Sequence, residues 1–190
     1  MSGKFFENQV DSAGPRGHDL PVPEPALRFV ELPALALAAL IAGDLPTASA
    51  ETGIELPEEF TDPDAQWLWQ LRYGQIQAKP GDAPWIARAV LVNDEVVGYA
   101  GYHGPPDENG MVEIGYTVLP RHRRRGHARA MLRALIQRGI DEPAVRTVRV
   151  TISPDNIASL ATIARERFVY VGEQHDEEDG RELIFELPAR

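Results

Sequence analysis

The chain contains no cysteine. This absence excludes a disulfide framework, a thiolate nucleophile and a zinc site built from thiolates. A protein without disulfides suits a reducing compartment, so we expect a cytoplasmic location.

Long apolar runs are also absent. The most apolar segment, ALALAALIAG (Ala34–Gly43), is far shorter than the roughly 20 residues that a membrane helix needs. The N-terminus has no basic stretch followed by an apolar core, which a secretion signal requires. We therefore expect neither a membrane partner nor a secretion signal.

Positive charge is scarce as well: 19 Lys and Arg stand against 29 Asp and Glu, for a net charge of -10. This balance argues against a protein that coats nucleic acid, because neutralising phosphates needs a broad basic surface. It suits a cationic substrate through long-range steering. The length of 190 residues fits one domain, and we expect residues 1–26, rich in Pro and Gly, to form a flexible arm before a single domain of residues 27–190.

Alternating and helical apolar patterns interleave along the chain, which predicts a mixed α+β protein built in three layers around a sheet. The segment 44–60 contains Pro46, Gly53 and Pro57 and is predicted to be a loop. The expected strands are 27–32, 85–92, 95–103, 111–119, 145–152, 168–173 and 181–187, and the expected helices are 34–42, 61–79, 126–139 and 153–167.

The scarce positive charge is concentrated in one place, RHRRRGHARAMLRALIQRG (Arg121–Gly139), whose first thirteen residues include six arginines. The run follows a predicted strand and begins a predicted helix. It fits three interpretations: a nucleic-acid patch, a solvated helix end and an anion-binding turn. Cations at a helix N-terminus are disfavoured by the helix dipole unless an anion is bound between them. Gly126 lets the backbone approach a ligand, so the run favours a pyrophosphate site.

The run has neither the Gly-Lys-Ser/Thr of a Walker loop nor the three glycines of a dinucleotide fingerprint. Instead, RRRGHA (Arg123–Ala128) resembles the GNAT N-acetyltransferase signature Arg/Gln-x-x-Gly-x-Gly/Ala. VEIGYTVLP upstream is similar to that family's fourth strand, and NIAS (Asn156–Ser159) to its Asn-x-x-Ser motif. The region after Asn156 looks most like the branch that includes ribosomal-protein N-terminal acetyltransferases.

This resemblance implies a largely antiparallel sheet of about six to seven strands flanked by about four helices, with acetyl-CoA between the fourth and fifth strands. It implies direct acetyl transfer to an amine, without an acyl-enzyme and without a metal. It also places the Val118 N–H at the thioester carbonyl as an oxyanion donor and Asn156 at the pantetheine arm. The pyrophosphate would contact the signature residues, mostly through main chain: Arg123, Arg124, Arg125, Gly126, His127 and Ala128, with Arg121, Arg124 or Arg129 reaching the nucleotide's phosphates.

An ammonium must lose a proton before it attacks, so a base is needed. Glu113 matches the position of the catalytic Glu of histone acetyltransferases, and His103 is the second candidate. The family's Tyr that protonates the departing thiolate is replaced by Ile163. Three alternatives are open: Ser159 takes that role, a water takes it, or the thiolate leaves unprotonated. Arg167 stands where the family has Gly.

Several alternatives stay open at this stage. The acceptor is a small-molecule amine or a protein N-terminus. A non-catalytic acyl-CoA sensor and, less favoured by charge, a nucleic-acid-binding protein are the competing functions. Tyr102, Tyr116, Trp67 and Trp69 are each expected either to line the substrate cleft or to pack the core. The oligomeric state is also open, with a homodimer as the candidate because dimers are the commonest soluble assembly.

Overall fold

The computed structural model describes residues 26–86, 88–176 and 180–189. The predicted arm therefore lies outside the described residues except for Ala26.

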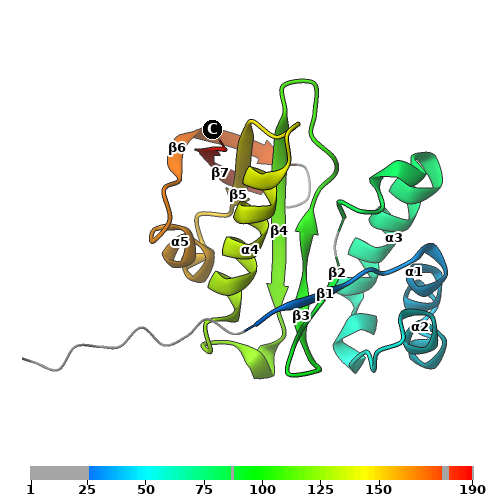
Figure 1. Ribbon diagram of the computed structural model, residues 1–190. Helices are drawn as coiled ribbons and strands as arrows, with labels where there is room; N and C mark the ends of the chain where they lie inside the picture. Colours follow the sequence, from blue (N-terminus) through cyan, green and yellow to red (C-terminus); the bar gives the residue numbers. More distant parts are fainter. Residues whose placement is uncertain (1–25, 87, 177–179, 190) are drawn as a thin grey trace, which may run out of the picture.

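Seven strands form one sheet in the order β1-β2-β3-β4-β5-β7-β6 (Figure 1). Within the described residues every neighbouring pair is antiparallel except β4 and β5, which run parallel. This confirms the expected mixed, largely antiparallel sheet. The strands are β1 (Arg28–Val30), β2 (Arg88–Val92), β3 (Glu95–Tyr102), β4 (Met111–Val118), β5 (Thr147–Ile152), β6 (Val169–Asp176) and β7 (Gly180–Pro188).

Helices cover both faces of the sheet and make the three layers (Figure 1). Ala89 and Leu91 of β2 pack against the first three helices, whereas Val90 between them packs in the cluster that contains the fourth helix. None of the described helices combines the length and the apolar character that crossing a membrane requires. The α-helices are α1 (Ala34–Ile41), α2 (Leu45–Thr52), α3 (Pro63–Ala78), α4 (His127–Asp141) and α5 (Ile157–Ile163), with short 3-10 turns η1 (Glu58–Thr61), η2 (Pro80–Asp82) and η3 (Pro120–His122).

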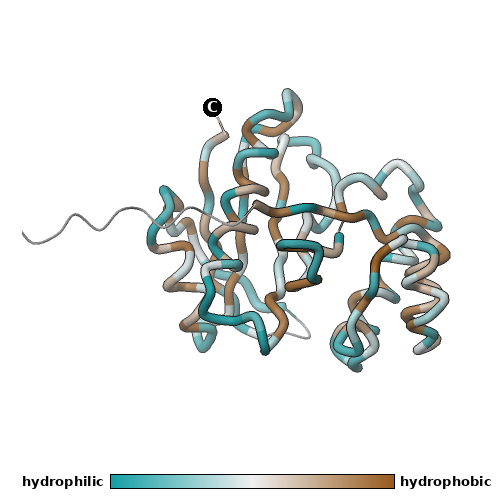
Figure 2. Tube along the Cα trace, turned by 60° about the horizontal axis from the view of Figure 1, so that its bottom comes forward, coloured by the Kyte–Doolittle hydropathy of each residue, from teal (hydrophilic) through white to brown (hydrophobic). Residues whose placement is uncertain are grey.

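Apolar residues concentrate along the strands and the inner helix faces, and hydrophilic ones in the connecting turns (Figure 2). Helix α4 buries Ala130, Met131, Leu132 and Leu135 against β3, β4 and β5, as its apolar stripe predicts. Tyr102 belongs to this core: it is buried and donates its hydroxyl to the Leu135 carbonyl at 2.5 Å. Burial raises the pKa of Tyr102 to about 12, so it does not ionise at neutral pH.

The prediction that 44–60 is a loop was wrong, because this segment contains α2 and η1. Two of the three residues taken as breakers mark the ends of α2, and the third, Pro57, precedes η1. Pro46 lies in the first turn of α2, Asp44 caps that helix by accepting the Thr47 N–H at 3.1 Å, and Gly53 ends it at φ +68°. Pro is tolerated at a helix start and Gly is favoured just past its end, so both residues fit a short helix as well as a loop.

Two other helix boundaries also differ from expectation. The helix predicted over 153–167 is α5, which begins only at Ile157 and is capped by Asn156: the Asn156 side-chain oxygen accepts the Ser159 N–H at 3.0 Å. The helix expected to stop at Gly139 continues to Asp141. Only the first change affects the site described below, because it commits one polar atom of Asn156 to the fold.

The two tryptophans of α3 differ sharply in environment and give a matched pair for a stability test. Trp69 is fully buried, donates to the Phe60 carbonyl at 2.8 Å and contacts the rings of Phe60 and Tyr99, whereas Trp67 is 48% exposed. Trp69→Ala should lower the free energy of unfolding by about 3–5 kcal/mol through cavity formation. Trp67→Ala should lower it by less than about 1 kcal/mol. Denaturant unfolding measures both, and equal losses would contradict this packing.

Candidate active site

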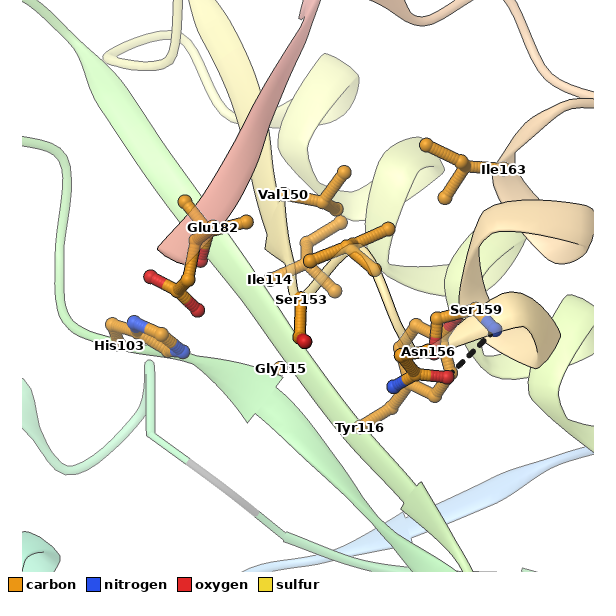
Figure 3. Close-up of a pocket in the computed structure, with 12 residues that line it drawn as sticks. His103, Ile114, Gly115, Tyr116, Val150, Ser153, Asn156, Ser159, Ile163 and Glu182 are labelled. Atoms are coloured by element: carbon orange, nitrogen blue, oxygen red, sulfur yellow. Dashed lines mark hydrogen bonds between the residues drawn. The ribbon is translucent and has the colours of Figure 1, made fainter. Parts of the chain in front are cut away.

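The parallel strands β4 and β5 pair over only three residues each, Met111–Glu113 against Thr147–Arg149, and then diverge. A pocket of about 440 Å³ lies where they separate (Figure 3). Its walls come from β4, β5, β7, the start of α5 and the segment that follows β3. The lining residues are His103, Ile114, Gly115, Tyr116, Val150, Thr151, Ile152, Ser153, Asn156, Ser159, Ile163 and Glu182.

The backbone of β4 has one side committed to β3 and the other turned toward this opening. The Glu113 carbonyl accepts from the His103 N–H, and the Leu119 N–H donates to the Val97 carbonyl of β3. In the register of β3 with β4, the odd-numbered positions between Glu113 and Leu119 therefore also bond to β3. Backbone groups alternate in direction along a strand, so the N–H groups of Tyr116 and Val118 face the side from which β5 has moved away. Val118, the predicted oxyanion donor, has this orientation but does not line the pocket, whereas Tyr116 does.

His103 and Glu113, the two predicted base candidates, lie together. The His103 Nδ1 is 3.6 Å from the Glu113 Oε1, and Thr151 donates to the same oxygen at 2.5 Å from across the opening. The other ring nitrogen of His103 lies over Gly115, where an added Cβ would come within 3.1 Å of it. The arrangement thus places Nε2 of His103 in the pocket and the Glu113 carboxylate behind the ring.

Helix α3 fixes the backbone of His103. Arg72 and Gln75 both donate to its carbonyl oxygen, at 2.9 and 3.0 Å, and Gln75 also donates to Asp82. Arg72 is buried, and burial lowers the pKa of its guanidinium while the charge of Glu113 partly offsets that effect. The buried cation therefore supplies positive potential beside Glu113.

The arginine run forms a tight turn before α4. Arg124 adopts φ +59° and Gly126 φ +84°, both left-handed, and Gly126 caps α4 without a side-chain hydrogen bond. The Arg123 Nε donates to the Val118 carbonyl at 3.1 Å and ties the turn to the end of β4. Arg124 and Arg125 are exposed and make no side-chain hydrogen bond or ion pair with the described part of the chain. The turn thus combines free helix N–H groups with two unpaired cations.

Other arginines of this region are held in ion pairs, and His127 is buried. Arg121 pairs with Glu59 at 2.6 Å, and Arg129 and Arg133 both pair with Glu166. These pairs leave Arg124 as the unpaired member of the three arginines predicted to reach the nucleotide's phosphates. His127 is buried, and burial together with the nearby positive groups lowers its pKa. The exposed charge of the turn therefore comes from arginine, not from His127.

The α5 wall of the pocket carries the remaining predicted residues. Asn156 uses its oxygen as the helix cap, which leaves its amide nitrogen toward the pocket, and Ser159 lines the pocket one turn later (Figure 3). Ile163 also lines it, so the usual Tyr position presents only an apolar side chain. The Tyr116 hydroxyl is buried without a well-formed hydrogen bond; burial raises the pKa of Tyr116, and the hydroxyls of Ser159 and Thr162 partly offset the rise.

The structure thus brings His103, Glu113, Asn156 and Ser159 to one opening, with the arginine turn beyond the end of β4. Sequence reasoning missed Arg72, Thr151, Ser153 and Glu182. No local pattern distinguishes them. Arg72 lies on an otherwise ordinary helix, Thr151 and Ser153 reach the pocket because β5 pairs with β4, and Glu182 reaches it because β7 pairs with β5.

Solved structures of similar fold include known acetyltransferases. The chain superposes on RimL, a ribosomal L7/L12 alpha-N-protein acetyltransferase in complex with coenzyme A, with a TM-score of 0.59 and 16% identity over 88% of this chain and 96% of RimL. It superposes equally on the microcin C7 self-immunity acetyltransferase MccE, in complex with acetyl-CoA and AMP, at 15% identity over 87% of this chain and 93% of MccE. At these identities the likeness establishes the fold alone.

Sequence comparison gives the family. The chain is 35% identical to the uncharacterized N-acetyltransferase YjdG of Bacillus subtilis over 77 residues, which span 40% of this chain and 46% of YjdG. The chain therefore matches about half the length of that relative. The family model described as an acetyltransferase (GNAT) domain matches residues 35–169, well over half of the sequence. The chain belongs to the GNAT acetyltransferase family.

Proposed function

We propose that the protein is an N-acetyltransferase that moves an acetyl group directly from acetyl-CoA to a primary amine. The observation that carries this proposal is the meeting of two groups in one pocket. A histidine nitrogen, backed by a carboxylate, lies over Gly115, and the N–H of the next residue, Tyr116, faces the same opening. A base and an oxyanion donor are what amine acylation requires.

Acetyl-CoA fits the residues present. The left-handed turn at Arg124 and Gly126 exposes the first N–H groups of α4, and Arg124 and Arg125 add positive charge, which suits a pyrophosphate. Main-chain groups of Arg123 through Ala128 would hold it, as the signature implies. The Asn156 amide nitrogen is placed to donate to the pantetheine arm. Acetyl-CoA supplies the activated thioester, and a thioester needs no nucleophilic cysteine in the protein.

His103 is the base that we propose, with Glu113 as its partner. The Glu113 carboxylate lies 3.6 Å from Nδ1, so its charge favours a proton on that nitrogen and would leave Nε2 able to take one from the acceptor. The Arg72 and Gln75 bonds to its carbonyl hold His103 against α3. The Tyr116 N–H would stabilise the developing oxyanion, and the Ser159 hydroxyl, in the pocket beside the apolar Ile163, would donate to the departing sulfur.

Acetyl-CoA binding is the first test. Acetyl-CoA at about one hundred times its dissociation constant should stabilise the protein by roughly 2.7 kcal/mol in thermal unfolding. The double variant Arg124→Ala/Arg125→Ala should weaken binding about 10- to 100-fold in calorimetry, because charged hydrogen bonds to phosphate are lost. Arg28→Ala, an exposed arginine on β1 paired with Asp94, is the control and should bind normally. Unchanged affinity in the double variant would move the pyrophosphate elsewhere.

The base assignment predicts an asymmetry between two variants. His103→Asn should lower kcat by about 10²- to 10⁴-fold with little change in acetyl-CoA affinity, because the proton acceptor is lost. Its rate should also no longer fall as pH is lowered through protonation of the imidazole. Glu113→Gln should lower kcat less than His103→Asn does, since it removes only the charged partner of Nδ1. Steady-state kinetics across pH measure this. A larger loss in Glu113→Gln than in His103→Asn would make Glu113 the base, and binding without turnover in the wild type would favour the sensor function.

A further inference from the structure

Glu182 is an acidic residue in the pocket to which the proposed chemistry assigns no role. Among the described residues that line the pocket, the ionisable side chains are His103, Tyr116 and Glu182, and none is a lysine or an arginine. Figure 3 shows its carboxylate turned toward the end of the pocket that holds His103, away from Ile163. The end of the pocket that holds His103, where the proposed amine acceptor would react, therefore has negative character.

The strand pairing explains how Glu182 reaches this position. The pairing of β5 with β7 ends at Ile152 opposite Leu183, so Glu182 is the first residue of β7 beyond the end of β5. On its other side it pairs with Gln174 of β6, whose amide donates to Oε2 of Glu182 at 3.0 Å. The second oxygen, Oε1, makes no hydrogen bond within the described residues. One side of the carboxylate is thus held, and the other remains able to accept.

The two carboxylates near His103 differ in how their charge is compensated. Glu113 accepts from Thr151, faces His103 and lies in the field of the buried Arg72. Among the described residues, Glu182 accepts from the neutral amide of Gln174 and has no lysine or arginine partner, because the neighbouring Arg181 is paired with Glu173 at 2.7 Å. A half-buried carboxylate without a cation is stabilised by binding one. A positively charged group of a ligand would therefore be stabilised most when it binds beside Glu182.

That charge is not the charge of the reacting nitrogen. The reacting amine has to be neutral when it attacks, and a carboxylate bound to it would hold the proton on it. A productive partner of Glu182 has to keep its charge throughout the reaction. We propose that Glu182 binds a second cationic group of the acceptor, so that the enzyme selects amines that carry a further positive charge, such as a diamine or a peptide with a basic residue next to its free N-terminus. This inference rests on the proposed acetyltransferase function.

A panel of matched acceptors tests it. Putrescine is compared with butylamine, and an Ala-Lys peptide with an Ala-Glu peptide of otherwise identical sequence, at saturating acetyl-CoA. The wild type should favour the cationic member of at least one pair by tenfold or more in kcat/KM. Which pair shows the preference identifies the source of the cation.

Glu182→Gln should abolish that preference by raising KM for the cationic acceptor about tenfold or more, with kcat within a few-fold of wild type. Glu51→Gln removes the same charge at an exposed position on α2 that does not line the pocket, and it is the control; its preference should stay intact. A preference that survives in Glu182→Gln would overturn the proposal. An equal fall of kcat for all acceptors, with an altered pH profile, would also overturn it, because Glu182 would then act as a base.

The proposed function can fail separately. If the wild type acetylates none of the four acceptors but binds acetyl-CoA, the acceptors are tested as ligands by calorimetry in the presence of coenzyme A. Weaker binding of putrescine or the Ala-Lys peptide to Glu182→Gln than to Glu51→Gln would then still support the cation site. Equal binding to the two variants would overturn it whether or not the protein is an enzyme.

Discussion

The short pairing of β4 with β5 is the constraint on which the site depends. Three residue pairs join these strands, and β5 then continues with β7 alone. The divergence leaves alternate backbone groups of β4 without a strand neighbour while β3 still fixes the other side of the same strand. An edge with unpaired polar groups is unfavourable when buried, so it favours a ligand that runs along it. His103, Asn156 and Ser159 surround this one edge.

Electrostatics divides the site into two ends of opposite sign. At the α4 end, two unpaired arginines and a helix N-terminus favour an anion. At the other end, Glu182 carries a charge that no described cation offsets, and the net charge of -10 extends the same preference over long range. An anionic cosubstrate and a cationic acceptor can therefore approach one pocket from different sides without competing for the same charges.

Local patterns were sufficient to predict most of the fold. Contiguous residues encode the alternating strands, the apolar stripe of α4 and the family signature at Arg123–Ala128. The observed strands and α4 confirm the first two, and the match to the family model agrees with the third. The loop expected at 44–60 was wrong because Pro46 and Gly53 read alike as breakers and as helix ends. Contacts between residues far apart in the sequence place His103 beside Glu113. Such contacts also bring Arg72, Thr151 and Glu182 to the site. Sequence spacing does not carry that information, so His103 and Glu113 appeared as alternatives rather than as a pair.

Amide hydrogen exchange along β4, followed by NMR with and without acetyl-CoA, tests the central claim most directly. The amides of Gly115 and Thr117 already pair with β3, whereas those of Tyr116 and Val118 face the opening. If acetyl-CoA binds along this edge, protection at Tyr116 and Val118 should rise at least about tenfold more than protection at Gly115 and Thr117. Saturating acetyl-CoA that leaves Tyr116 and Val118 no better protected than their neighbours would contradict the account, because the divergence of β4 and β5 would then not be where the cosubstrate binds.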